Sequence, residues 1–474
     1  MTTAIDNILG ALDERVEAML SACTRCGLCV EACPMPASAD IDVSRPQDVI
    51  GGVLDILRGG HGSEAAQRWA RVCSGSGFCI DACDESVNPR FLLAMARRAL
   101  HKRTEASARR AAGRANFKKM SRGVRVLARL QLAPELIERL SPSSHPERDT
   151  PPELIFYTGC NLIKTPHIGL LCLDVLDRLE VRYEVHGGPS SCCGILQLRG
   201  GDDENAMRQG ARTLEKFAQT ETSEVLAWCP TCQIQFSETM LPAPILSKMP
   251  LPIPLQISGQ IPSQVAAVEA PPPATSADFD MTMFPVYLAR RLDELRPHLT
   301  KRVEKRVALH EHPGTAGVTE AVIELLSAVP GVEVVDLRLP RLGYTLNSLA
   351  SVPHTQKKML ATEFAAAEAA GVTTLAGIYH SDHRELAGHQ GQWPFEFVNY
   401  MEIIGESMGC VREDVFKRLK TMRDVDAIVA DSADLIHLHG MNLDEVREVV
   451  IADMLNDQVL PVDRHEHAAY LDAD

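Results

Sequence analysis

Two stretches of the chain share one pattern of apolar and polar positions. In each stretch, apolar runs of strand length alternate with longer segments whose apolar residues recur at helical spacing. The first stretch reads strand, helix, strand, turn, helix, strand over 153–159, 170–180, 182–187, 190–194, 203–219 and 224–232. The second repeats this order over 306–314, 320–329, 332–339, 341–348, 357–370 and 373–383. Alternating elements of this length predict an α/β fold with two parallel-sheet repeats.

The remainder of the chain is predicted to be helical. Stretches rich in Pro mark two linkers, at 141–152 and 270–280. We therefore expect an N-terminal helical module, a basic helical connector, two α/β repeats and an acidic helical tail, over residues 1–100, 101–150, 151–270, 281–410 and 411–474.

Charge and hydropathy narrow the classes of function. The 474 residues include 48 Lys and Arg against 63 Asp and Glu, a net charge of −15, which argues against nucleic-acid binding. No apolar run reaches the roughly 18 residues of a transmembrane helix, and no secretory signal pattern opens the chain, so we expect a cytoplasmic protein. The segment 90–130, with thirteen basic residues and one acidic residue, suits an acidic partner subunit or an anionic membrane face, or is a solvated helix face.

The fourteen cysteines are clustered along the chain. In a reducing compartment, clustered cysteines bind metals or do redox work. Four of them have the spacing of a bacterial ferredoxin, Cys-x2-Cys-x2-Cys-x3-Cys-Pro, at Cys23, Cys26, Cys29 and Cys33. In that spacing three thiolates bind one [4Fe-4S] cubane and the fourth binds a second cluster. A structural zinc site usually has two separated cysteine pairs, so the run predicts a two-cluster ferredoxin-type module.

A second, incomplete run follows at Cys73, Cys79 and Cys83, with Ser76 in the slot of the missing ligand. If the clusters exchange their fourth ligands, Cys83 joins the first three cysteines of the first run, and Cys33 joins Cys73 and Cys79. A hydroxyl is a poor ligand beside thiolates. The second cluster is then either [3Fe-4S] or a [4Fe-4S] cluster with an oxygen ligand, and its loss is the alternative.

Five more cysteines lie just after predicted strands of the first repeat, at Cys160, Cys192, Cys193, Cys229 and Cys232. The carboxyl ends of parallel strands meet in one crevice, so we expect the five thiols to meet there. As thiolates they would repel one another unless a strong cation is present. Disulfide pairing is the alternative, which a reducing compartment disfavours. The two remaining cysteines, Cys172 and Cys410, are expected to be buried structural thiols.

These five cysteines form the pattern Cys-x31-Cys-Cys-Gly-x34-Cys-x2-Cys. It resembles the cysteine-rich CCG domain of heterodisulfide reductases and of the iron–sulfur subunits of glycolate oxidase, anaerobic glycerol-3-phosphate dehydrogenase and lactate-utilisation complexes. The order of a two-cluster ferredoxin module and two such repeats resembles the fused, D-type polypeptide of heterodisulfide reductases. By that resemblance the five cysteines would bind a non-cubane [4Fe-4S] cluster.

The second repeat departs from this family. In place of the cysteines and the CCG sequence it has Glu311, Arg341, Leu342, Gly343, His380 and His383. A second non-cubane cluster is therefore not expected, which counts against cleavage of a disulfide between two such clusters. The two histidines at these positions, together with His310 and His312, would either bind a different metal or form hydrogen bonds in a site that has lost its cluster.

These features predict an iron–sulfur electron-transfer subunit of an oxidoreductase complex. Electrons would enter from a flavoprotein dehydrogenase or an electron-transfer flavoprotein and leave to a quinone or another carrier. No GxGxxG sequence lies between a predicted strand and helix, so flavin or nicotinamide chemistry is expected on a partner. Such a chain would be cytoplasmic, or held peripherally at the inner membrane face. The alternative is a heterodisulfide reductase-like thiol/disulfide reductase that uses the CCG-bound cluster.

Overall fold

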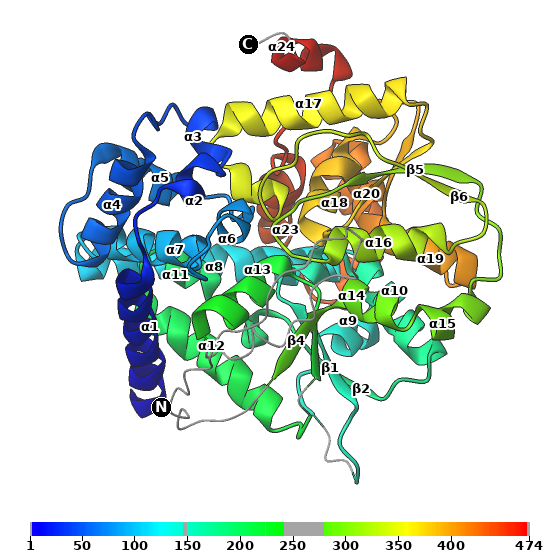
Figure 1. The fold of residues 1–474 in the computed structure, drawn as a ribbon. Coiled ribbons are helices and arrows are strands. Elements are labelled where there is room, and N and C mark those ends of the chain that lie inside the picture. Colours follow the sequence, from blue (N-terminus) through cyan, green and yellow to red (C-terminus); the bar gives the residue numbers. More distant parts are fainter. Residues whose placement is uncertain (1, 146–148, 223, 241–278, 472–474) are drawn as a thin grey trace.

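The computed structural model describes residues 2–145, 149–222, 224–240 and 279–471. The N-terminal part is helical, as expected, and lies at the left of Figure 1. Its described residues form α1 (Thr2–Ala22), α2 (Leu28–Glu31), α3 (Met35–Ser38), α4 (Pro46–Leu57), α5 (Glu64–Val72), α6 (Phe78–Asp81) and α7 (Pro89–His101). Helices α4, α5 and α7 bury Val53, Trp69 and Leu93 in one core. The two ferredoxin-type cysteine runs surround the short helices α2 and α6.

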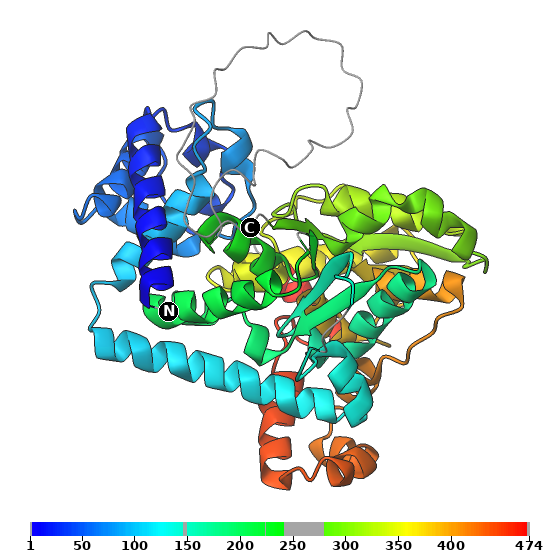
Figure 2. The same ribbon diagram turned by 90° about the horizontal axis from the view of Figure 1, so that it is seen from below.

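The basic connector consists of α8 (Ala106–Arg129) and α9 (Pro134–Leu140). Figure 2 shows α8 running along one side of the molecule, from the N-terminal helices to the C-terminal ones. The predicted linker 141–152 contains neither helix nor strand in its described residues. Most of the linker predicted at 270–280 lies outside the described residues, and its last residue, Asp280, begins a strand.

Each repeat contains one four-stranded parallel sheet, which confirms the predicted α/β class. The strands are β1 (Leu154–Gly159), β2 (Tyr183–Gly187), β3 (Glu224–Ala227), β4 (Asp280–Met283), β5 (Lys305–His310), β6 (Val332–Val335), β7 (Thr374–Gly377) and β8 (Glu396–Asn399). The sheet orders are β2-β1-β3-β4 and β6-β5-β7-β8, so the two repeats have the same topology. Every residue of the central strand β1 is buried, as expected for a parallel strand covered on both faces.

Many helices of the two repeats share one hydrophobic core, whereas two helices of the second repeat bury Leu360 and Leu386 in another. In the first repeat the helices are α10 (Pro166–Arg178), α11 (Ile195–Arg199), α12 (Asp203–Ala218) and α13 (Pro230–Ile234), which continues as the π-helical turn η3 (Gln235–Met240). In the second they are α14 (Phe284–Arg290), α15 (Leu292–Leu295), α16 (Val318–Ser327), α17 (Pro353–Ala369), α18 (His380–Leu386) and α19 (Tyr400–Met408). Helix α10 packs against α19, and Trp228 of the first repeat stacks on Tyr400 of the second, with ring centroids 5.9 Å apart. The repeats therefore form one body.

Three predicted features of the repeats need correction. Each sheet has a fourth strand, β4 or β8, that the repeat pattern did not include. The strand predicted over 332–339 ends at Val335, because Arg338 adopts a left-handed backbone with φ of 53° and Pro340 follows it. The strands predicted over 224–232 and 373–383 end at Ala227 and Gly377. Their last residues belong to the helices that follow, 230–234 and 380–386.

The acidic tail forms helices that pack on the connector and on the second repeat. They are α20 (Val415–Met422), α21 (Val425–Asp431), α22 (Ala433–Leu438), α23 (Leu443–Val450) and α24 (Ala468–Leu471). The last turns of α8 bury Val126 and Leu127 against Phe416 and Leu419. The tail is thus an integral part of the fold.

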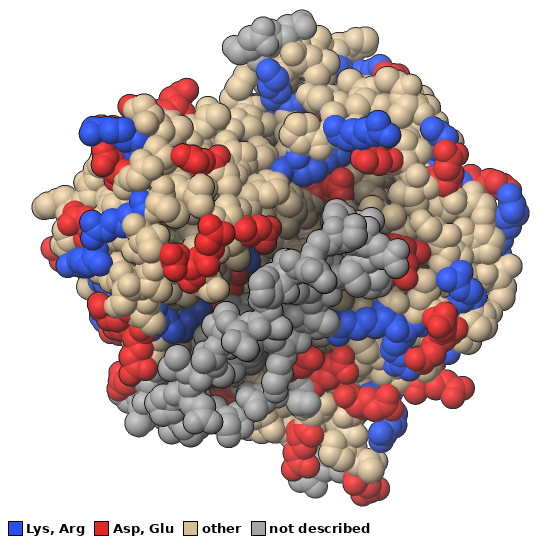
Figure 3. Space-filling view, viewed as in Figure 1, with Lys and Arg blue, Asp and Glu red and all other residues tan. Residues whose placement is uncertain are grey.

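The basic segment 90–130 finds acidic partners within the chain itself. Arg122 and Arg125 of α8 pair with Glu445 of α23, and Arg98 of α7 pairs with Asp203 of α12, with Nε 2.6 Å from Oδ2. On the face drawn in Figure 3, basic and acidic side chains are interspersed. Part of the segment therefore docks the N-terminal and C-terminal helices onto the first repeat.

Candidate metal centres

The first cysteine group lies between two turns that share one backbone geometry. Gly27 and Gly77 both have φ of 90°, and each begins a four-residue helix, a conformation that glycine adopts without strain. The match places Ser76 at the position that Cys26 holds in the first turn, as the spacing of the two runs predicts. Three cysteines of the first run and one of the second line a single small cavity: Cys23, Cys26, Cys29 and Cys83.

The chemistry of this cavity fits a metal cluster. Burial, followed by the neighbouring thiols Cys23 and Cys26, raises the pKa of Cys29 to about 12. Four thiolates at such short range repel one another, so they become ligands only when a cation offsets their charge. The iron of a cubane is such a cation, and the residues present fit it.

A second cavity is lined by Cys33, Cys73 and Cys79 together with Ser76. Burial, followed by the thiols of Cys73 and Cys33, raises the pKa of Cys79 well above its ordinary value. The indole Nε1 of Trp69 donates to Cys33 Sγ at 3.3 Å, a contact that would stabilise a thiolate. Three sulfurs and one hydroxyl thus face one space, which fits an iron–sulfur cluster with one weak corner.

Ser76 also connects this cavity to the second repeat. Its Oγ accepts a hydrogen bond from the backbone N–H of Gly343 at 2.7 Å and lies 3.1 Å from Ser74 Oγ. Gly343 belongs to the turn that aligns with the CCG sequence, and its φ of 75° matches the left-handed conformation of Gly194, whose φ is 82°. The turn that has lost its cysteines in the second repeat therefore packs on the serine slot of the second cysteine group.

The third group comprises the five thiols at the carboxyl ends of β1, β2 and β3. They form a continuous chain of side-chain contacts, in the order Cys160, Cys192, Cys193, Cys232 and Cys229. The Cys232 thiol, by hydrogen bonding, lowers the pKa of Cys229 to about 7. All fourteen cysteines of the chain are free thiols. Five largely buried sulfurs in mutual contact fit a cluster with several iron ions.

Tyr157 completes this third group. Its hydroxyl donates to the carbonyl of Ser191 at 2.7 Å and lies 3.7 Å from Cys232 Sγ. Burial, followed by the surrounding thiols, raises the pKa of Tyr157 well above its ordinary value. The phenol therefore stays neutral beside the sulfurs.

In the second repeat, the corresponding space is filled by a hydrogen-bonded chain of side chains. His310 Nδ1 lies 2.6 Å from the carboxylate of Glu363, and His310 Nε2 lies 3.3 Å from His312 Nε2. Nδ1 of His312 donates to the carbonyl of Leu342 at 2.6 Å. Although burial opposes it, Glu363 raises the pKa of His310, whereas burial lowers the pKa of His312 to about 4. A protonated His310 can thus donate to both neighbours, and this favours the hydrogen-bonding alternative for these two histidines.

The other two predicted histidines lie elsewhere. Tyr379, and not His380, holds the helix-capping position in α18 that Cys229 holds in α13, so the sequence alignment of these helices is wrong by one residue. His380 is buried, and burial lowers its pKa well below the ordinary value. His383 Nε2 lies 2.7 Å from Asp414 Oδ2. Within the described residues, the four histidines do not converge on one site. Glu311 lies 3.7 Å from Arg341, through its Oε1 and the Nε of the arginine.

Cys172 and Cys410 lie away from the three groups. Cys172 is fully buried in α10, as predicted. Cys410 follows α19 and is half-buried, with its sulfur 3.6 Å from Nη2 of Arg178; its predicted burial is thus only partly correct.

Arg90 joins the three parts of the chain at one point. Its Nη1 donates to the carbonyls of Gly75 at 3.0 Å and of Gly314 at 2.7 Å, and its Nε donates to Glu238 at 3.1 Å. Gly75 lies in the turn of the second cysteine group, Gly314 in the second repeat, and Glu238 in the turn after the last CCG cysteine. Although burial opposes it, Glu238 raises the pKa of Arg90, which keeps the guanidinium charged.

A cavity of about 320 Å³ lies beside Arg90. Its lining includes Cys73 of the second group and Thr231, which precedes the last CCG cysteine. The charged residues of the lining are mostly arginines, with one acidic residue, Glu238; the arginines are Arg71, Arg90, Arg97, Arg98 and Arg199. Although Arg90 and Arg98 pair with carboxylates, the cavity has an excess of cationic residues.

The sequence did not identify three residues of these sites: Arg90, Tyr157 and Glu238. In the sequence Tyr157 is one more apolar residue of a buried strand, and Arg90 is one more charge of the basic segment. One signal was present for Arg90. It stands at the second position of α7, after Pro89, where the helix dipole disfavours a cation, and this placement indicates a specific partner.

Comparisons with known proteins agree with this arrangement. Residues 154–237 match the CCG cysteine-rich domain, and residues 17–37 match the 4Fe-4S binding domain. The chain is 22% identical over 354 residues to the D-type subunit of the dihydromethanophenazine:CoB–CoM heterodisulfide reductase of Methanosarcina mazei, an alignment that covers 67% of this chain and 75% of that protein. No solved structure matches the chain significantly. None of the helices in the described ranges has the length and hydrophobicity that crossing a bilayer requires. The matched domains and this relative identify the chain as a CCG-domain iron–sulfur protein similar to the D-type polypeptide of heterodisulfide reductases.

Proposed function

We propose that this chain is the electron-transfer subunit of an oxidoreductase complex and passes electrons between a flavoprotein and a quinone or another carrier. The flavoprotein would be a dehydrogenase or an electron-transfer flavoprotein. The observation that carries the proposal is the packing of the cysteine groups. Cys73 of the second group and Thr231, which directly precedes Cys232 of the third, line one cavity. Arg90 donates hydrogen bonds both to Gly75, in the turn of the second group, and to Glu238, in the helical turn that follows the third. A protein that conducts electrons must hold its cofactors in such a fixed relation.

In this proposal the three groups hold three clusters. The first four-thiol group would hold a [4Fe-4S] cubane, and the second would hold a [3Fe-4S] cluster or a [4Fe-4S] cluster with an oxygen ligand from Ser76. The third group would hold a non-cubane [4Fe-4S] cluster on Cys160, Cys192, Cys193, Cys229 and Cys232. When bound, these clusters supply one-electron redox chemistry.

The residues around the clusters would set the order of the clusters' reduction potentials. The guanidinium of Arg90 lies close enough to Cys73 and Cys79 to interact with their charge, and a nearby cation favours the reduced, more negative state of a cluster. Trp69 donates to Cys33, which has the same effect. With three thiolates instead of four, the second group is suited to a higher potential than the first, and so to delivery toward a mild acceptor.

The proposal is tested by following electrons through the anaerobically purified holoprotein. The chain is mixed with a reduced flavoprotein donor and then with a short-chain quinone, and cluster absorbance is followed by stopped flow. We expect Cys193→Ala to slow quinone reduction at least tenfold while the ferredoxin-type clusters are still reduced. Cys172→Ala, which changes a buried thiol outside the three groups, should stay within twofold of wild type. Equal quinone rates for wild type and Cys193→Ala would overturn the proposed route.

Two observations favour a second candidate function, that of a thiol/disulfide reductase. The relative from Methanosarcina mazei is named as a heterodisulfide reductase subunit, and the cationic cavity beside Thr231 suits a disulfide that carries carboxylate groups. In that reaction the disulfide takes two electrons and two protons and yields two thiols. The assay supplies reduced methyl viologen and glutathione disulfide and measures free thiol. Turnover that falls in Arg97→Gln would support this candidate, and absence of turnover would exclude it for this class of disulfide.

A further inference from the structure

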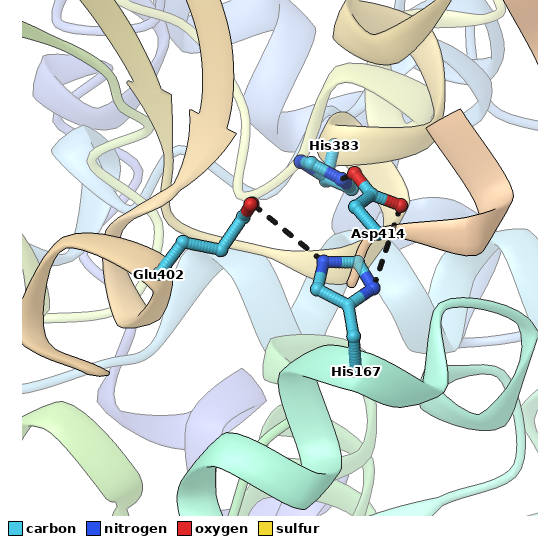
Figure 4. Close-up of side chains that lie close together, drawn as sticks. All are labelled: His167, His383, Glu402 and Asp414. Carbon is cyan, nitrogen blue, oxygen red and sulfur yellow. Dashed lines mark hydrogen bonds and ion pairs between the residues drawn. The ribbon is translucent and has the colours of Figure 1, made fainter. Parts of the chain in front are cut away.

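A buried group of two imidazoles and two carboxylates lies between the two repeats, away from the cysteine groups. We call it the inter-repeat group, and its members are His167, His383, Glu402 and Asp414. Each offers one ligand atom, and these four atoms all lie within 4.8 Å of one another. Figure 4 shows the side chains pointing toward one another from different elements. Only His383 was a candidate ligand from the sequence.

The four side chains come from both repeats. His167 is the second residue of α10 in the first repeat. His383 lies in α18 and Glu402 in the first turn of α19, and Asp414 is the N-cap of α20. Whatever binds this group therefore joins the first repeat to the second and to the C-terminal helices.

His167 has no hydrogen-bond partner among the described residues for either ring nitrogen, although its side chain is only 3% exposed. Its Nε2 lies 3.6 Å from Glu402 Oε1, and its Nδ1 lies 3.5 Å from Asp414 Oδ1. Both separations are longer than the roughly 2.7–3.2 Å of a hydrogen bond. They resemble the separation of about 3.3 Å between two ligands of one tetrahedral zinc ion whose ligand bonds are about 2.0–2.1 Å long. The Nδ1 of His383 is buried and, in the same described ranges, without a partner as well.

Backbone donors hold both carboxylates in place. The N–H of Asn399 donates to Glu402 Oε1 at 2.7 Å, and the N–H of Lys417 donates to Asp414 Oδ1 at 2.9 Å. Metal sites are commonly built in this way, with the ligands oriented by a second layer of hydrogen bonds.

The local charge favours a further cation. Lys417 is the ammonium group nearby, with Nζ 3.5 Å from Asp414 and 3.8 Å from Glu402, and it donates to the carbonyl of Phe397 at 2.8 Å. With neutral imidazoles, two carboxylates and one ammonium leave one negative charge in the protein interior, which is costly unless it is compensated. A divalent ion or a proton on His167 would supply the compensation.

We propose that the inter-repeat group binds one zinc ion, which ties the two repeats together. Imidazole nitrogens and carboxylate oxygens are ligands that zinc accepts, and the set has no thiol that would attract the iron of the clusters. The site is closed, since three of its four side chains are at most 4% exposed and Glu402 is 18% exposed. The ion would therefore be structural, and its role is independent of the route of electrons.

The test measures zinc and iron together in the anaerobically purified holoprotein by plasma mass spectrometry. We expect about one zinc per chain in wild type and less than about 0.1 in His167→Gln, with the iron content unchanged. His389→Gln, a substitution of a buried histidine just beyond α18 that lies outside the group, should retain about one zinc. Wild type that purifies without zinc and takes up none on addition of one equivalent would overturn the proposal, as would full retention of zinc in His167→Gln.

A second measurement, X-ray absorption at the zinc edge of wild type, does not depend on the folding of any variant. It also distinguishes zinc in the inter-repeat group from zinc bound at a cysteine site. We expect a shell of nitrogen and oxygen alone at about 2.0–2.1 Å. A sulfur shell at about 2.3 Å would show that the zinc occupies thiols instead, and the proposal would fall.

Discussion

Arg90 connects three parts of the chain through its hydrogen bonds. Of the contacts in the fold, its loss has the most predictable effect on the free energy of unfolding. Its side chain is 14% exposed and that of its partner Glu238 is 7% exposed, so the pair is largely shielded from water. Arg90→Met would remove the cation that contacts the Glu238 carboxylate, leaving the more distant charge of Arg15, and would also remove the donor to the carbonyls of Gly75 and Gly314. Loss of one partner of a buried ion pair costs about 3–5 kcal/mol.

A double variant separates the charge from the other hydrogen bonds. In Arg90→Met/Glu238→Gln no unpaired charge remains, and the cost falls to the about 1–3 kcal/mol expected for unsatisfied backbone carbonyls. The difference, about 2 kcal/mol, is the cost of burying the Glu238 carboxylate without its guanidinium partner. Arg71→Met is the matched control, because Arg71 lines the same cavity but is exposed, and its guanidinium donates to the neighbouring Gln67 of its own helix.

The assay is the thermal unfolding midpoint of the anaerobic holoprotein at one scan rate, since unfolding of a large cluster-containing protein is governed by kinetics. At about 1 °C per kcal/mol for a chain of this length, Arg90→Met should lower the midpoint by roughly 4 °C and the double variant by roughly half as much, whereas Arg71→Met should change it by less than about 1 °C. Equal losses in the single and double variants, or a loss in Arg90→Met no larger than in the control, would refute the buried ion pair as the link between the parts.

Three further predictions concern the cysteine groups and the second repeat. Cys193→Ala should remove the cluster of the third group and leave the ferredoxin-type EPR signals, and loss of all signals together would contradict the separation of the groups. Ser76→Cys restores a fourth thiolate and should convert an oxidised three-iron signal into a lower-potential cubane with slower electron delivery; two ordinary low-potential cubanes in wild type, unchanged by the substitution, would show that Ser76 is not at a ligand slot. Burial lowers the pKa of His312 to about 4, so the unfolded chain binds more protons between about pH 6.5 and 4, and stability should fall with pH over that range by up to about 3 kcal/mol. His312→Gln should show a smaller fall in the unfolding midpoint between about pH 7 and 5 than wild type, and an equal fall would contradict a neutral His312.

The repeats could be predicted from the sequence because their central strands are long apolar runs between helical segments. The same pattern located the third cysteine group, since a residue that follows a parallel strand is confined to one edge of the sheet, whereas spacing alone located the first two. The fourth strands β4 and β8 escaped prediction because they have no cysteine or turn pattern to mark them, whereas β3, β6 and β7, which are equally short, lie within the repeat pattern. Short strands of this kind are defined by pairing with β3 and β7 and not by local preference.

The contacts between parts were the least predictable. The carboxylate partners of Arg90 and His167 lie 148 or more residues away. Apart from the place of Arg90 in the first turn of α7, nothing local distinguishes these residues from ones that face solvent. The one-residue error at His380 has another cause. His380 and His383 repeat the spacing of Cys229 and Cys232, whereas the strand ends and helix caps of the structure pair Cys229 with Tyr379.

The measurement that tests the central claim most directly is the iron and sulfide content of the anaerobically purified chain, read together with its EPR spectrum during a redox titration. Three clusters on the three cysteine groups predict about eleven or twelve irons per chain, with at least two signals that appear at different potentials. A fully reconstituted sample that holds only about four irons and a single signal would contradict the three-cluster account.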